Sequence, residues 1–550
     1  MKKRFLSLVL LSALMLVLAA CNFGGTKEKD TSSGGQSSSG TTKNEDKTLN
    51  LSIASEPPSL NPQLATDSTS GAIIRAAFEG LTRVDKDGNV QNAMAEDVKV
   101  SDDKLTYTFK LREAKWSNGD PVVAGDFAYA WKWALDPKNA SEYASILYPI
   151  KGAAAFNGGK GSADDLGIKV VDEKTLEVTL ENPTPYFLEL TAFYTYMPVN
   201  EKVVKDNKKW FAEAGDTYVT NGPFTLSDWK HNDSITLKKY ADYWDKDNVA
   251  LSTVNVKMVE SETTANRMFK SGDLDYLGSP YQTVPLDAMD GYKKDKTLKS
   301  MPYAAIYEYK FNTKGKFTKN ANIRKALSYA IDRQGLADNV LKGGQKPALS
   351  NVPVAIEGFE DQNNKFKDND IEAAKKALEE GMKELGIKKA SDIKIGISIN
   401  TSEAHAAIAQ YIQEGWHKNL GIEVKMDNSE WQVFLDKVTA LDYDVARMGW
   451  IADFNDAYTF LERYDTAKNG NNDTAWEDPK YKSLLVSATK ETDENKRLDL
   501  LKEANTVLAE QMPIAPIYFY VNNYVEKDYV KNMAPNKLGE IDLKAVDIEK

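Results

Sequence analysis

Apolar and polar residues alternate in several short segments of the first 180 residues, a period of two that is typical of half-buried β-strands. The segments with this pattern, each expected to form a strand, are 49–53, 105–111 and 176–180. Between the last two, the spacing becomes helical over 126–135 and predicts a helix that stops before Pro137. That helix is expected to bury Phe127, Ala130, Trp131 and Ala134.

The second half of the chain alternates helical and strand patterns instead. Helices are expected over 323–331, 404–416, 431–438 and 498–508, and strands over 393–399, 422–426 and 443–448. Because a helix joins strands 393–399 and 422–426, these two strands are expected to pair in parallel. The intervening helix is expected to bury Ala404, Ile408, Tyr411, Ile412 and Trp416. We expect no long segment without helix or strand after residue 48.

The first 47 residues show an export pattern rather than a folded one. Lys2, Lys3 and Arg4 precede an apolar run that is too short for a membrane span and is typical of a signal peptide over 1–20. The run ends at Leu18-Ala19-Ala20-Cys21, small residues before a Cys that form a lipobox, so Cys21 is the expected site of lipidation. Residues 21–47 are almost entirely polar and are expected to form a disordered tether.

Composition narrows the classes of function. The chain has 550 residues, 42% of them hydrophobic, and a formal charge of -11, which argues against nucleic acid as a partner. The three His and the single Cys do not have zinc-ligand spacing, and neither a phosphate-binding P-loop nor a GxSxG nucleophile motif is present. We therefore expect no cofactor, no metal and no enzymatic activity.

The window Tyr443 to Asn455 carries the strongest candidate chemistry. Its strand pattern contains Arg447 and leads through Gly449 and Trp450 to Asp453, with Trp431 and His405 on the two preceding helices. A free peptide has an ammonium at one end and a carboxylate at the other. Asp453 suits the ammonium, Arg447 with His405 suits the carboxylate, and backbone near Gly449 suits an extended main chain. By spacing alone, packing roles for the tryptophans and structural ion pairs for the charged residues stay open.

Longer motifs bring a family resemblance. They are "AAFEGLTRVDKDG" from Ala76, "KWSNGDPVVAGDFAYAWKWALDP" from Lys115, "NGPF" from Asn221, "NIRKALSYAIDR" from Asn322, "EWQVFLDK" from Glu430 and "YDVARMGWIADFND" from Tyr443. With these motifs in this order, the chain resembles the oligopeptide-binding proteins of bacterial ABC importers, within the peptide- and nickel-binding class of solute-binding proteins.

The resemblance implies a three-lobed α/β fold of the periplasmic-binding-protein kind. Lobe I is expected from 48–78, 205–305 and 520–550, lobe II from 79–204, and lobe III from 306–519. It also implies ligand-binding residues, which are Asp453, Arg447, His405, Trp450, Trp431, Gly449, Ile451, Tyr143 and Ser68. The chain departs from some relatives at Val438, where they carry Arg, at Ile451, where they carry Cys, and at Thr66, where a Glu is expected.

The expected function is capture of oligopeptides with little sequence specificity and delivery to the permease subunits of an ABC importer. The expected location is the outer face of the cytoplasmic membrane, with the lipid on Cys21 as the only membrane attachment and a monomer as the default state. Three alternatives stay open: another ligand on the same fold, such as a dipeptide, a nickel chelate or a sugar; a signalling receptor or adhesin; and a surface peptidase.

Overall fold

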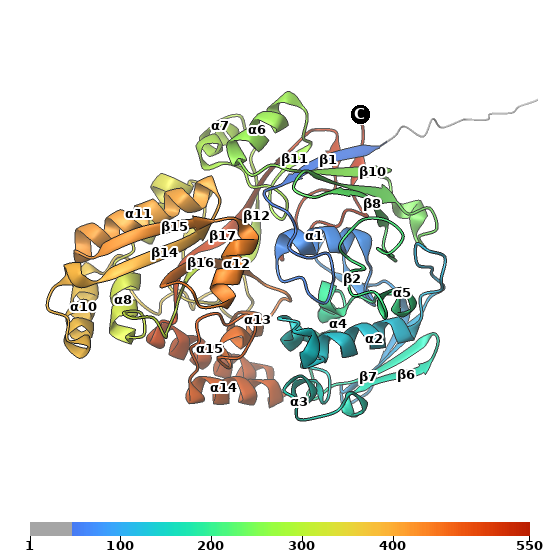
Figure 1. Cartoon of the computed structure of the whole chain (residues 1–550), viewed down its shortest axis with the longest axis horizontal. Helices are drawn as coiled ribbons and strands as arrows, with labels where there is room; N and C mark the ends of the chain where they lie inside the picture. Colours follow the sequence, from blue (N-terminus) through green and yellow to red (C-terminus); the bar gives the residue numbers. More distant parts are fainter. Residues whose placement is uncertain (1–46) are drawn as a thin grey trace, which may run out of the picture. The chain divides into compact units, whose positions relative to one another are not determined.

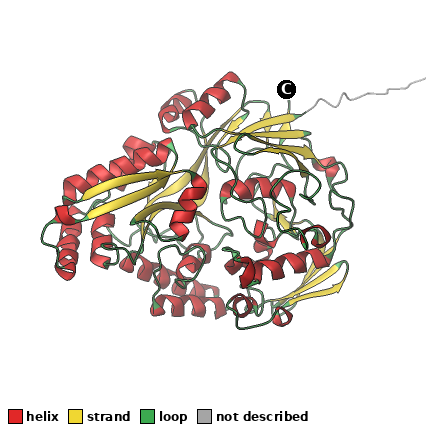
Figure 2. Cartoon of the chain, viewed as in Figure 1, coloured by secondary structure: helices red, strands yellow, loops and turns green. Residues whose placement is uncertain are grey.

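The computed structural model describes residues 47–550, which contain three principal β-sheets with helices packed against them (Figures 1 and 2). Cys21, the expected signal peptide and all but the last residue of the expected tether lie outside the described residues. The expectations about export, lipidation and the tether therefore remain sequence predictions.

The first sheet joins the beginning of the described chain to a later segment. Its order is β1-β10-β9-β8, with β1 parallel to β10 and the other pairs antiparallel. The strands are β1 (Thr48–Ile53), β8 (Phe224–Lys230), β9 (Ser234–Lys239) and β10 (Thr253–Met258). Beside it lies helix α1 (Ser68–Ala77), which begins at Asp67 because that carboxylate accepts hydrogen bonds from the N–H groups of Thr69 and Ser70.

The second sheet is antiparallel and has the order β4-β5-β7-β6. Its strands are β4 (Ala95–Val100), β5 (Thr106–Leu111), β6 (Ile168–Asp172) and β7 (Thr175–Thr179). Helix α2 (Ala124–Leu135) packs on it through the four apolar residues expected from the sequence, all of which are buried. The expected helix and strands in this part of the chain are confirmed.

The third sheet has the order β11-β17-β12-β16-β14-β15, with β13 paired to β17. Its strands are β11 (Tyr276–Leu277), β12 (Lys299–Phe311), β13 (Lys346–Pro347), β14 (Lys394–Asn400), β15 (Glu423–Ser429), β16 (Val445–Ile451) and β17 (Ile514–Glu526). The parallel pairing of β14 with β15 across helix α11 (Glu403–Leu420) is confirmed. Strand β14 pairs with β16 only at Val445 and Ala446, so no described strand covers that edge of β16 beyond residue 446.

Helices cover this sheet and extend from it (Figure 2). They include α6 (Glu262–Ser271), α7 (Met289–Lys294), α8 (Ala321–Tyr329), α10 (Ile371–Leu385), α12 (Trp431–Thr439), α14 (Pro479–Lys490) and α15 (Glu494–Gln511). The expected helices are confirmed, but two of the burial predictions for α11 are wrong. Ala404 is only half-buried because it lines a cavity, and Tyr411 is half-buried with its hydroxyl donating to Asp332.

One expectation about the loops is also wrong. Residues 348–370, between β13 and α10, contain neither helix nor strand. Their order comes from packing, because Val352, Ile356 and Phe359 are buried in the same apolar cluster as residues of α14 and α15. Pro353 and Gly358, the latter with a positive φ of 80°, break any regular pattern in this segment.

Strands β12 and β17 link different parts of the described chain. Each runs unbroken past a lobe limit expected from the sequence, at 305/306 and 519/520. One part of β17 pairs with β11. Asp275, the residue before β11, accepts a hydrogen bond from the backbone N–H of Asn50 in β1 at 2.7 Å. The other part packs in the apolar cluster of α8, α10 and α11. Two adjacent strands thus connect regions with separate apolar cores.

Candidate functional site

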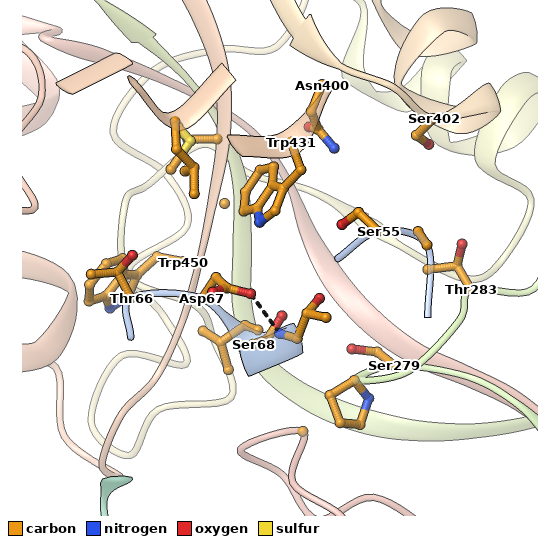
Figure 3. Close-up of a pocket in the computed structure, with 18 of the residues that line it drawn as sticks. Ser55, Thr66, Asp67, Ser68, Ser279, Thr283, Asn400, Ser402, Trp431 and Trp450 are labelled. Carbon is orange, nitrogen blue, oxygen red and sulfur yellow. Dashed lines mark hydrogen bonds between the residues drawn. The ribbon is translucent and has the colours of Figure 1, made fainter. Parts of the chain in front are cut away.

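A cavity of about 1050 Å³ lies among these regions and is lined by residues from early, middle and late parts of the chain. All nine ligand-binding residues expected from the sequence line it: Ser68, Tyr143, His405, Trp431, Arg447, Gly449, Trp450, Ile451 and Asp453. In Figure 3, Thr66, Asp67 and Ser68 lie on one side of Trp431, and Asn400 and Ser402 lie on the other. The fold thus brings together residues nearly 400 positions apart.

Asp453, two residues after β16, is the acidic group at the centre of this arrangement. The Tyr143 hydroxyl donates to its two carboxylate oxygens, at 3.1 and 3.0 Å, and the Thr459 hydroxyl lies 3.3 Å from Oδ2. Burial nevertheless raises the pKa of Asp453 from 3.8 to about 7. No cation forms an ion pair with it within residues 47–550. A cationic group arriving from the cavity would therefore find an undercompensated carboxylate.

Aromatic rings fix the surroundings of this carboxylate. Tyr143 stacks on Trp450 with ring centroids 6.0 Å apart and an interplanar angle of 2°, and Phe193 stacks at 5.5 Å from Tyr143. The Arg463 guanidinium lies 4.4 Å from the Trp450 ring, and its charge is neutralised by Glu308 at 2.8 Å. The indole N–H of Trp450 donates to Thr459 at 3.2 Å. These contacts hold Trp450 as a rigid wall of the cavity.

Arg447 is the basic counterpart on the same strand. Its guanidinium donates to Asn400 Oδ1 at 3.3 Å and to the Tyr520 hydroxyl at 3.2 Å, and it lies 4.9 Å from the Tyr307 ring. Its Nε has no hydrogen-bond partner, and no carboxylate of the described chain lies within ion-pair distance. A half-buried guanidinium without an acidic partner favours an anionic ligand.

His405 lies near Arg447 but is not a second cation. Burial, together with the positive charge of Arg447, holds the pKa of His405 well below its ordinary 6.5. Its Nδ1 lies 3.4 Å from the Tyr307 hydroxyl. At neutral pH the imidazole is therefore uncharged, and it offers a ligand a hydrogen bond rather than an ionic attraction. This refines the sequence expectation that His405 adds to the charge of Arg447.

Gly449 and Ile451 belong to the half of β16 whose edge lacks a strand partner within the described chain. An ideal Cβ added at Gly449 would lie 3.2 Å from the Ile306 carbonyl oxygen and 3.3 Å from the Tyr520 hydroxyl. Glycine therefore lets β12 and Tyr520 approach this strand closely. The free edge of residues 447–451 presents backbone groups that an added extended chain can pair with.

Trp431 and Ser68 face each other across the cavity in Figure 3. Trp431 begins helix α12 and stacks on Phe434 with ring centroids 5.9 Å apart, while Ser68 begins helix α1 after the capping Asp67. The indole N–H of Trp431 has no hydrogen-bond partner in residues 47–550. Both residues thus contribute to the walls of the cavity.

The sequence analysis missed Asn400, Thr459 and Tyr520, which hold Arg447 and Asp453 in place. Asn400 ends a strand pattern that was recognised, so its place at a strand end was a usable signal. Thr459 and Tyr520 carry no such signal because their roles depend on contacts between distant segments. Within the described residues, no group of His, Cys, Asp or Glu is arranged to hold a metal ion, and no helix is both long and apolar enough to span a membrane.

Comparisons with known proteins agree on one class. The family model "Bacterial extracellular solute-binding proteins, family 5 Middle" matches residues 89–472. The oligopeptide-binding protein OppA of Bacillus subtilis is 51% identical over 544 residues, which cover 98% of each chain.

Two solved structures differ in how well they superpose on this chain. OppA of Haemophilus influenzae, in complex with the peptide RPPGFSPFR, matches with a TM-score of 0.86 at 31% identity and covers 92% of this chain and 99% of its own. The periplasmic murein tripeptide binding protein MppA in its unliganded open form has the same identity and covers 92% and 98%, but its TM-score is 0.61. The described chain therefore has the lobe arrangement of the peptide complex rather than that of the open form.

Proposed function

Because this chain belongs to the bacterial extracellular solute-binding proteins of family 5, we propose that it captures oligopeptides outside the cytoplasm and delivers them to the permease subunits of an ABC importer. The observation that carries the proposal is that one cavity contains both the Asp453 carboxylate and the Arg447 guanidinium, and that neither has an oppositely charged partner among the described residues. A free peptide brings the complementary charges at its two ends.

The ammonium of the peptide pairs with Asp453. Ion pairing replaces the water that the buried carboxylate has lost, and the Tyr143 and Thr459 hydroxyls keep the carboxylate aimed at the cavity. The carboxylate of the peptide pairs with Arg447, and neutral His405 donates or accepts a hydrogen bond beside it. Both ends of the ligand are thus recognised without reference to its side chains.

The peptide main chain pairs with the free edge of β16. From Arg447 to Asp453 the chain advances six residues, at most about 20 Å at roughly 3.3 Å per extended residue. A peptide of up to about six residues would span that length. Backbone pairing is independent of side-chain identity, and a cavity of about 1050 Å³ leaves room for water around varied side chains. This explains low sequence specificity.

The lobes follow the limits expected from the sequence. Lobe I comprises 48–78, 205–305 and 520–550, lobe II comprises 79–204, and lobe III comprises 306–519, with β12 and β17 as the connections that bend when the cavity opens. The separate apolar cores of lobe I and lobe III, joined by the uninterrupted course of these two strands, support the division between these two lobes, whereas lobes I and II share one apolar cluster.

The protein acts outside the cytoplasm, as its family does, and we propose that a lipid on Cys21 anchors it through a flexible tether of residues 21–47. The anchored body acts as a monomer. It leaves its ligands chemically unchanged, which separates it from the surface peptidase considered above.

The proposal is tested with one pentapeptide in three forms: free, N-acetylated and C-amidated. Calorimetric titration should give tight binding of the free peptide, and each blocked form should bind at least tenfold more weakly because one buried charge is left unpaired. Mass analysis of the recovered peptide should show it uncut. Equal binding of all three forms, or cleavage, would reject the proposed recognition.

A further inference from the structure

Two helix N-termini face each other at the edge of the cavity. Helix α6 begins at Ser261 and helix α11 begins at Ser402, and each serine is followed by a glutamate. These helices pack in different apolar clusters, α6 with β11 and Val525, and α11 with β14 and α10. Figure 3 places Ser402 and Thr283, which follows α6 in the chain, on either side of the same end of the cavity. The two helices thus approach each other from opposite walls.

The residues at these N-termini bond reciprocally. The Ser261 hydroxyl donates to Glu403 Oε1 at 2.8 Å, and the Thr263 hydroxyl donates to Glu403 Oε2 at 2.6 Å. In return, the Ser402 hydroxyl donates to Glu262 Oε1 at 2.6 Å. We call these five residues, Ser261, Glu262, Thr263, Ser402 and Glu403, the clasp. Each helix therefore supplies a carboxylate to the hydroxyls that begin the other.

Two electrostatic effects meet at this contact. Helix N-termini carry partial positive charge, so two of them brought together repel each other. Here Glu262 and Glu403 stand between them and offset both dipoles. Glu262 is 5% exposed and its carboxylate contacts no Lys, Arg or His at ion-pair distance among residues 47–550. Burial and the nearby Glu403 carboxylate raise its pKa, and hydrogen bonds, the one from Ser402 among them, offset this only in part. Such an arrangement exists only when the two helices are close.

The clasp also connects to the proposed ligand site. The Ser402 hydroxyl accepts a hydrogen bond from the backbone N–H of His405 at 3.3 Å, and both residues line the cavity. The described lobe arrangement matches the peptide complex of OppA and differs from the open form of MppA. Opening of the cavity would separate α6 from α11 and break all three interhelical bonds.

We infer that Glu262 and Glu403, with the three hydroxyls that they accept from, hold the cavity shut over the peptide and so set the lifetime of the complex. The inference rests on the proposed function for its ligand, since it concerns how that site closes. These are positioning residues. A ligand that binds the closed state gains apparent affinity in proportion to the population of that state, so weakening the clasp lowers affinity and speeds dissociation.

The test compares two matched pairs of variants in the mature chain. Thr263→Val removes one clasp hydroxyl with little change of shape, whereas Thr263→Ser keeps it. Glu403→Ala removes the acceptor of two clasp bonds. Glu384→Ala is its control, because Glu384 also accepts from two side chains, Asn320 and Asn322, but these contacts join α8 and α10, which pack in the same apolar cluster.

Affinity and dissociation are measured with alanine peptides of three to six residues. We expect Glu403→Ala to raise Kd about tenfold, equivalent to about 1.4 kcal/mol, mainly through faster dissociation. Thr263→Val should have a smaller effect in the same direction, and Thr263→Ser and Glu384→Ala should behave as wild type. Equal Kd and dissociation rate for Glu403→Ala and wild type would overturn the inference.

A second readout needs no ligand. With Cys21 changed to Ser, cysteines introduced at the exposed positions Lys294 on α7 and Lys418 on α11 are the only thiols, so spin labels report the distance between the two walls. Glu403→Ala should shift the distance distribution of the peptide-free protein towards longer values, and Glu384→Ala should leave it unchanged. An unchanged distribution for Glu403→Ala would count against the clasp. If wild type binds no alanine peptide but the distances still shift, the proposed function fails and the clasp stands.

Discussion

Replacing Asp453 by Asn tests the recognition of the peptide ammonium most sharply. The two side chains have nearly the same shape, so the negative charge is removed while the Tyr143 hydroxyl can still donate to the one remaining oxygen. Burial raises the pKa of Asp453 from 3.8 to about 7, which corresponds to roughly 4 kcal/mol against the ionised form in the peptide-free protein. A bound ammonium restores favourable electrostatics, and leaving that ammonium unpaired costs on the order of 3–5 kcal/mol.

We therefore expect Asp453→Asn to raise the Kd of a free pentapeptide at least a hundredfold in calorimetric titration at pH 8. The same variant should unfold at a higher temperature than wild type in the absence of peptide. The sign follows from the raised pKa: ionised Asp453 destabilises the folded state above pH 7, and this penalty shrinks as the pH falls and the group binds a proton. The stability advantage should accordingly be larger at pH 8 than at pH 5. Wild-type affinity combined with wild-type stability would refute the reasoning.

Three further outcomes are expected. Wild-type affinity for free peptides should fall as the pH drops below about 7, to roughly a hundredth at pH 5, because protonation of Asp453 competes with the ammonium; a flat titration between pH 5 and 8 would contradict this. Arg447→Met should weaken binding of a free peptide at least tenfold and affect its C-amidated form far less, as measured by calorimetry, and equal losses for both would remove Arg447 from the carboxylate site. Glu308→Ala should destabilise the fold by about 3–5 kcal/mol in urea unfolding because Arg463, 1% exposed beneath Trp450, loses its buried partner; a change below 1 kcal/mol would be inconsistent with that pair.

Much of this architecture was predictable from local patterns. The alternation over 393–399 and 422–426 with a helix between them correctly predicted parallel pairing of β14 and β15. The motifs around Trp450 and Asp453 led to the family that the comparisons show. These features depend on short-range periodicity or on contiguous residues, which a single sequence displays directly.

Other features depend on contacts that no local pattern encodes. Tyr143 and Asp453 are 310 positions apart, and only the fold reveals that a hydroxyl donates to the carboxylate. The neutral state of His405 depends on burial and on the charge of nearby Arg447. The sequence analysis did not expect the irregular segment 348–370, and its buried Ile356 and Phe359 make it part of a core. The sequence thus pointed to residues that line the cavity, but not to their electrostatic states.

The central claim is that the cavity captures oligopeptides, and native mass spectrometry of the protein, purified without refolding, tests it directly. The account predicts extra mass on the folded protein that resolves, on denaturation, into a mixture of short peptides with free termini. Their lengths should not much exceed the roughly six extended residues that the distance from Arg447 to Asp453 allows. Protein that carries no extra mass and takes up no free peptide on titration would contradict the account.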